Sequence, residues 1–126
     1  MEIERKDYPG LTQPAGAFHH SVRVGNLLFI AGSTARGTSA ETGDIAAQTE
    51  VILQKFQTIL EANGASLSNV VKVTSFVTDL REAPASGEVR RKYFEGAFPA
   101  STQVQVAALG TPDIKIEIEA IAALPE

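Results

Sequence analysis

The sequence contains no cysteine, which excludes disulfide bonds and thiolate metal sites. It also has no apolar run long enough to span a membrane. Residues 1–6 are charged and lack the apolar core of a secretion signal. These absences predict a protein of the cytoplasm.

An excess of positive charge is absent as well. The 126-residue chain carries 11 lysine and arginine residues against 15 aspartate and glutamate residues, which gives a net charge of -4. Surfaces that bind nucleic-acid phosphates need clustered lysine and arginine side chains. Neither a nucleic acid nor a membrane is therefore expected as the partner.

Nothing in the composition indicates more than one domain. A hydrophobic fraction of 44% and a charged fraction of 21% are typical of a globular protein. No internal repeat, low-complexity tract or linker-like segment interrupts the chain. We expect residues 1–126 to form a single domain.

The spacing of apolar residues predicts five strands and two helices in the order ββαβαββ. Gly25-Asn26 is suited to a tight hairpin turn between the first two strands. The first helix is capped by Thr42 or Asp44 and stops at Asn63-Gly64. The expected strands cover residues 20–24, 27–31, 70–78, 102–107 and 114–122, and the second helix covers residues 82–94. This order predicts an α+β fold, with an antiparallel or mixed sheet and both helices on one face.

Two of the predicted strands, residues 27–31 and 70–78, are apolar on both faces. In the second of them, alternation puts Val71 and Val73 on one side and Val70 on the other. The helices can cover only one face of the sheet, so the other face needs a further subunit. Burial of apolar surface contributes roughly 25 cal/mol per Å², enough to drive association. We therefore expect an obligate homo-oligomer.

Four segments resemble the RidA/YjgF family in their order and spacing. They are residues 24–32, 71–80, 98–102 and 116–122, the last of which reads IEIEAIA. The resemblance implies a chorismate-mutase-like fold and a homotrimer with a central barrel and small-molecule clefts between subunits. In the best-known branch of the family it implies hydrolysis of reactive enamines and imines to ketones and ammonia. It implies no cofactor and no metal.

The resemblance also implies a catalytic role for Glu119. In the deaminating branch, a carboxylate near the end of the last strand directs the attacking water, and Glu119 matches it. Addition of water to an iminium carbon requires a group that orients the water and accepts a proton. The alternative is that Glu119 is a polar residue on the solvated face of the strand, beside Lys115 and Glu117.

Three other positions depart from the deaminating pattern. Ala108 stands where the family has the arginine that holds the substrate carboxylate, and a methyl group cannot form that bidentate contact. Phe18 and Arg90 replace a tyrosine and an asparagine of the cleft. Arg90 either restores positive charge to the cleft or is a solvated residue near the carboxyl end of its helix. Deamination of imines derived from amino acids is therefore in question.

Three further residues are candidates for the cleft. His20 falls where relatives often have a histidine, and the alternative is a hydrogen-bonded structural role. Gly32 and Ser33 either offer backbone N–H groups to a ligand or form an ordinary loop turn. His19 and His20 are adjacent at the start of a predicted strand, where neighbouring side chains point to opposite faces, so we expect no shared metal ion.

Two functions remain open from the sequence. The first is a hydrolase of an enamine, imine or related C–N compound, in which Glu119 directs water and the substrate differs from the family norm. The second is a trimer that keeps the cleft without the chemistry and serves as a metabolite sensor or accessory subunit. RNA cleavage is a third hypothesis, which the acidic balance of the chain disfavours.

Overall fold

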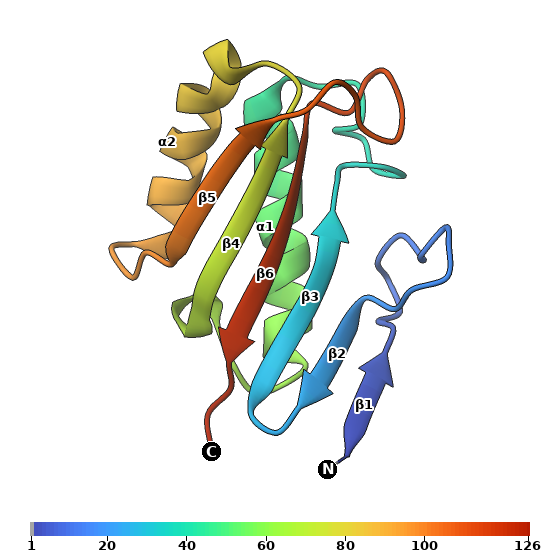
Figure 1. Cartoon of the computed structure of the whole chain (residues 1–126), viewed down its shortest axis with the longest axis vertical. Coiled ribbons are helices and arrows are strands. Elements are labelled where there is room, and N and C mark those ends of the chain that lie inside the picture. Colours follow the sequence, from blue (N-terminus) through green and yellow to red (C-terminus); the bar gives the residue numbers. More distant parts are fainter. Residues whose placement is uncertain (1) are drawn as a thin grey trace.

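The computed structural model describes residues 2–126, and these form one mixed sheet with both helices on the same face (Figure 1). The strands are β1 (Ile3–Lys6), β2 (Ser21–Val24), β3 (Leu27–Ser33), β4 (Val70–Val77), β5 (Ala100–Gln105) and β6 (Ile116–Ala123). Their spatial order is β1-β2-β3-β6-β4-β5, and the helices are α1 (Ile45–Glu61) and α2 (Ala83–Phe94). The predicted α+β class is confirmed.

Strand β1 is the element that the sequence prediction missed. It pairs antiparallel with β2 at the edge of the sheet, and all of its residues are exposed. It therefore lacks the alternation of buried and exposed side chains that identifies a strand. The element order is βββαβαββ, and the predicted strands and α2 begin and end within two residues of their predicted positions.

Helix α1 begins and ends at the predicted signals. The side chain of Asp44 accepts the backbone N–H of Ala47 at 2.8 Å, which is the N-cap interaction. Just beyond the helix, Gly64 adopts a positive φ of 70°. Fully buried side chains on the sheet side of α1 form the centre of the core: Ile52, Leu53, Phe56 and Leu60. No helix among residues 2–126 is both long and apolar enough to cross a membrane.

Strand β6 lies in the middle of the sheet, between β3 and β4. Its even-numbered residues, from Ile116 to Ala122, are buried against the helices. Side chains alternate along a strand, so the odd-numbered residues, including Glu117 and Glu119, point away from the helices. We call this second side of the sheet the open face.

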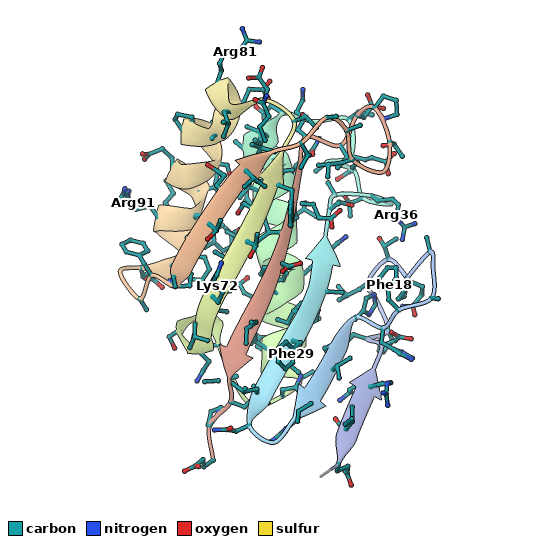
Figure 2. All side chains as sticks on the ribbon, in the orientation of Figure 1. Phe18, Phe29, Arg36, Lys72, Arg81 and Arg91 are labelled. Atoms are coloured by element: carbon teal, nitrogen blue, oxygen red, sulfur yellow. The ribbon has the colours of Figure 1, made fainter. Side chains whose placement is uncertain are left out.

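The open face carries apolar side chains that nothing within the described chain covers. Phe29 in β3 is 42% exposed and Val71 in β4 is 47% exposed, and Figure 2 shows Phe29 and Lys72 on this side of the sheet. The prediction that Val71 shares a side with Val73 is wrong. The pairing of β4 with β6 shifts between Val70 and Lys72, which places both Val70 and Val73 against the helices.

One buried amide in α1 fastens two loops to the helix. Gln48 is fully buried, and its Nε2 donates to the carbonyl oxygens of Glu41, Gly43 and Asp113 at 3.2, 3.1 and 2.8 Å. Its Oε1 accepts the backbone N–H of Lys115 at 2.9 Å. Gln48 therefore links the segment before α1 to the segment that leads into β6.

Replacement of Gln48 by leucine should strongly destabilise the fold. It would leave buried carbonyl and N–H groups without partners, and we expect a loss of about 2 to 4 kcal/mol in the free energy of unfolding. Urea denaturation measures this loss. Gln54→Leu, on the exposed side of the same helix, is the control and should change stability by less than about 0.5 kcal/mol. Equal effects of the two substitutions would contradict the role of Gln48.

Candidate functional site

A cavity of about 350 Å³ lies between the amino-terminal loop (residues 8–20), the end of β3 and the loop before β6. We call it the main cavity. Charged groups of Glu117, Lys55 and Arg36 line it, together with the apolar side chains of Phe18 and Ile59. Apolar walls with a few converging polar groups are typical of sites for small molecules.

The main cavity brings together four of the predicted site residues. Phe18 and His20 come from the amino-terminal loop, and Gly32 and Ser33 come from the end of β3. Their segments are distant in sequence, and the antiparallel pairing of β2 with β3 brings them close. These four residues line one cavity, as a shared cleft requires. That they bind a substrate there stays a prediction.

Glu119 lies outside the main cavity. It borders a neighbouring hollow on the open face, together with Phe29 and Ile121. Phe18 is half exposed and lines both hollows, so the two hollows share its side chain. The carboxylate inside the main cavity belongs to Glu117, which sequence reasoning treated only as a neighbour of Glu119.

Gly32 makes room for the side chain of Glu117. A Cβ atom at position 32 would collide with the Glu117 carboxylate. The carboxylate of Glu117 can therefore lie directly against the backbone of β3 only because residue 32 has no side chain. A glycine following the apolar run of residues 27–31 was the one sequence signal that could have indicated Glu117.

The environment of Glu117 favours its protonated form. Burial raises the pKa of the Glu117 carboxyl above its ordinary value, and the negative charge of Glu119 raises this pKa further. A carboxyl group with a raised pKa in a cavity is a common feature of sites that exchange protons with a substrate. Glu117 is therefore chemically equipped to accept and return a proton.

His20 supports the amino-terminal loop with both of its ring nitrogens. Nδ1 accepts the backbone N–H of Tyr8 at 3.0 Å, so this hydrogen bond assigns the proton to Nε2. Nε2 then donates to the carbonyl oxygen of Thr12 at 2.9 Å. The ring lines the cavity, and its hydrogen bonds agree with the structural alternative for this residue.

Arg90 and Ala108 are not part of the main cavity. Arg90 reaches from α2 to the helix side of the sheet, where Nη2 donates to Ser101 Oγ at 2.9 Å and Nη1 to Ser75 Oγ at 3.5 Å. Burial lowers the pKa of the Arg90 guanidinium, so this side chain is not an ordinary solvated helix residue. Ala108 is exposed in the loop after β5.

Sequence reasoning also missed the basic side chains of the main cavity. Lys55 comes from α1, and its Nζ donates to the carbonyl oxygen of Thr34 at 2.6 Å. Arg36, labelled in Figure 2 beside the amino-terminal loop, donates from Nη2 to the carbonyl oxygen of Gln13 at 2.8 Å. Burial lowers the pKa of Lys55, and the charge of Arg36 lowers it further. In the sequence, both residues have the pattern of ordinary surface positions.

Comparison with known proteins identifies the family. A family model described as Endoribonuclease L-PSP matches residues 10–124, nearly the whole chain. A 2-iminobutanoate/2-iminopropanoate deaminase from Dermatophagoides farinae is 33% identical over 116 residues, which are 90% of each protein. The chain belongs to the YjgF/RidA family.

Solved structures of this family share the fold. A member of the YjgF/YER057c/UK114 family from Mycobacterium tuberculosis aligns with a TM-score of 0.84 and 32% identity, over 98% of this chain and 100% of that chain. Escherichia coli TdcF, solved with bound serine, aligns with a TM-score of 0.79 and 30% identity, over 90% of this chain and 92% of that chain. The family resemblance seen in the sequence is confirmed.

Gly32→Ala tests whether the backbone of β3 positions Glu117. The added methyl group should push the carboxylate toward solvent, and the pKa of Glu117 should fall toward its ordinary value. Stability should change by less than about 1 kcal/mol, because the displaced group ends a flexible side chain. Carbon NMR titration of the carboxyl resonances measures the pKa.

Gly87→Ala in α2 is the matched control, since a Cβ atom there meets nothing within 4 Å. It should leave the Glu117 titration unchanged. If the pKa of Glu117 is the same in wild type and Gly32→Ala, the contact with Gly32 does not set it.

Proposed function

We propose that the main cavity hydrolyses a small imine or enamine, and that Glu117 directs the attacking water. The observation that carries this proposal is the half-buried Glu117 carboxyl, with its raised pKa, in the main cavity that Phe18 also lines. The relative from Dermatophagoides farinae, named for deamination of 2-iminobutanoate and 2-iminopropanoate, supports it. The fold alone would not support this proposal, since one fold can host different chemistries.

Imine hydrolysis needs one group that first accepts and then donates a proton. Ionised Glu117 accepts a proton from water while the water oxygen bonds to the carbon of the protonated imine and the electron pair of the C=N bond moves to nitrogen. The protonated carboxyl then donates this proton to the amine nitrogen of the adduct. The C–N bond breaks and ammonia leaves, while the hydroxyl group of the adduct loses its proton to solvent and becomes the ketone oxygen. A raised pKa suits both steps, because the proton is held long enough to be returned.

Two carboxylates are candidates for this role, and we assign it to Glu117 because that residue lines the main cavity. Glu119, which the family resemblance indicated, lines the neighbouring hollow on the open face. Its negative charge contributes to the raised pKa of Glu117. We propose that Glu119 tunes the acid–base group without contacting the reacting atoms.

Glutamine substitutions separate the two roles. Glu117→Gln cannot accept a proton, and we expect kcat/KM for freshly generated 2-iminobutanoate to fall by at least about 100-fold. Glu119→Gln should stay active, with the acid limb of its pH profile moved to lower pH. The reason is that loss of the Glu119 charge lowers the pKa of Glu117, so Glu117 stays ionised in more acidic solution. A coupled assay of 2-oxobutanoate formation measures both. An inactive Glu119→Gln beside an active Glu117→Gln would reverse the assignment.

A second candidate function is a binding protein without chemistry, serving as a sensor or accessory subunit. Ala108 favours it, because the resemblance implies a carboxylate-binding arginine at that position. The same assay decides between the two functions. A wild-type protein that binds 2-oxobutanoate and hydrolyses neither charged nor neutral imines would favour the binding function.

We also propose that the open face packs against further copies of the chain to form a homotrimer. Apolar side chains of Phe29, Val71 and Val104 are between 41% and 47% exposed there, although side chains of this size usually lie inside. The hollow that Glu119 borders lies on the same face. Assembly would therefore bring a second subunit close to Phe18 and to the main cavity.

Light scattering tests the assembly. We expect a particle of about three times 13.4 kDa and a shift toward monomer in Phe29→Glu, since a charge would be buried between subunits. Leu80→Glu is the control, because Leu80 is 48% exposed and lies outside the strands. A stable wild-type monomer at micromolar concentration would contradict the proposal.

A further inference from the structure

Lys55 presents an amine to the main cavity in a setting that is unusual for lysine, because lysines removed from water are normally paired with an acid. Its side chain runs from α1 to the residue after β3, where Nζ donates to the carbonyl oxygen of Thr34 at 2.6 Å. Within residues 2–126, no carboxylate oxygen lies within 4.0 Å of Nζ. The amine is therefore partly buried and held by a neutral acceptor.

The surroundings of Lys55 disfavour its ammonium form. Burial lowers the pKa of this residue, and the positive charge of Arg36 lowers it further. Thr34 joins the two basic residues, since its carbonyl oxygen accepts Lys55 and its hydroxyl oxygen accepts the backbone N–H of Arg36 at 3.2 Å. A lysine that is desolvated and placed beside a second cation is one known form of an activated nucleophile. The neutral amine, whose electron pair is free to react, is therefore more populated in Lys55 than in an exposed lysine.

The other titratable groups around Lys55 do not reverse this effect. In the main cavity these are His20, whose ring nitrogens are both hydrogen-bonded, and Glu117, which lies more than 4.0 Å from Nζ. Lys55 also borders a hollow beside Gly37 and Thr58, whose other lining residues are uncharged. Among the described residues, no compensating negative charge is in contact with the amine.

The walls of the main cavity favour an uncharged partner for this amine. Leu11, Phe18 and Ile59 contribute apolar side chains, and a volume of about 350 Å³ is enough for a small organic molecule. An uncharged aldehyde or ketone enters such a site without the desolvation cost that a charged ligand carries. Its carbonyl carbon is an electrophile with which a neutral amine reacts.

We propose that Lys55, beside Arg36 in the main cavity, is a nucleophilic amine that condenses with small uncharged aldehydes and ketones to form a Schiff base. This activity is distinct from the hydrolysis proposed above, because the nucleophile is the Lys55 amine and not a water molecule directed by Glu117. The hydrogen bond to Thr34 suits this role, since a neutral amine has two N–H groups and can donate one while its electron pair reacts.

The condensation proceeds in two stages. The electron pair of Nζ bonds to the carbonyl carbon, the π pair of the C=O bond moves to oxygen, and one proton passes through solvent from nitrogen to oxygen. The carbinolamine then takes up a proton from solvent at its hydroxyl group, the C–O bond breaks, and water leaves as the nitrogen pair forms the C=N bond. The iminium product keeps one N–H, which can donate to the Thr34 carbonyl oxygen, and loses this proton to solvent when the neutral imine forms.

Reductive trapping tests the proposal. The full chain is incubated with butanal and sodium cyanoborohydride, which reduces a Schiff base to a stable secondary amine, and peptide mass spectrometry measures the rate of labelling at each lysine. Near neutral pH we expect Lys55 to be labelled at least about tenfold faster than the exposed Lys92 of α2, because more of its amine is neutral. Unfolding in urea should make the two rates equal, since it removes the burial.

Two variants separate activation of the amine from its accessibility. Arg36→Met removes the neighbouring positive charge, so the pKa of Lys55 should rise and its labelling should slow by at least about threefold. Arg91→Met, at an exposed position in α2, is the matched control and should leave labelling of Lys55 unchanged. The proposal is overturned if Lys55 is labelled no faster than Lys92 in the folded protein, if the preference persists in urea, or if Arg36→Met is labelled at the wild-type rate.

Schiff-base formation and the proposed hydrolysis can fail separately. Glu117→Gln should lose hydrolysis and still be labelled at Lys55, because the amine needs no carboxylate to attack a carbonyl carbon. Rapid labelling of Lys55 in a wild type that hydrolyses no imine would keep the nucleophilic amine and refute the hydrolase. Hydrolysis of imines by a wild type whose Lys55 is labelled no faster than Lys92 would keep the hydrolase and refute the nucleophilic amine.

Discussion

The central position of β6 is the constraint on which the site depends. This strand pairs with β3 on one side and with β4 on the other, so both neighbouring strands fix its register. Its even-numbered side chains fill the core under the helices, which forces Glu117 and Glu119 onto the open face. The pairing with β3, irregular between Ile30 and Ser33, also brings Glu117 against Gly32. A slip of one residue would turn both carboxylates into the core.

The main cavity contains an acidic group from β6, Glu117, and a basic group from α1, Lys55, and the pKa of each is shifted by its surroundings. Burial of the Glu117 carboxyl on the sheet raises its pKa, and the neighbouring negative charge of Glu119 raises it further. Burial of the Lys55 ammonium group on α1 lowers its pKa, and the positive charge of Arg36 lowers it further. In both cases desolvation is the largest cause, and like charge adds to it. Both groups are therefore closer to neutrality than the same residues in water, which is how many sites prepare for proton exchange.

Local patterns in the sequence predicted most of the fold and only part of the site. The N-cap at Asp44 and the stop at Gly64 depend on neighbouring residues, so they could be predicted. The side on which Val71 lies depends on a shift in pairing with a distant strand, which no local pattern records. The same holds for the cavity, whose charged groups come from the loop after β3, from α1 and from β6. Family resemblance supplied Phe18 and His20 but directed attention to Glu119 and not to Glu117.

Gln48 and Lys55 are seven residues apart on α1, which places them two turns apart on one face of the helix. One anchors the loops around the cavity, and the other supplies a charge inside it. Buried residues such as Ile52 lie between them on that face, so any repacking that moves α1 along its axis moves both. Substitutions that move this helix therefore alter the shape of the cavity and the stability of the fold together. The amino-terminal loop contributes Phe18, which is half exposed, so a substitution there can reshape the cavity without disturbing the core.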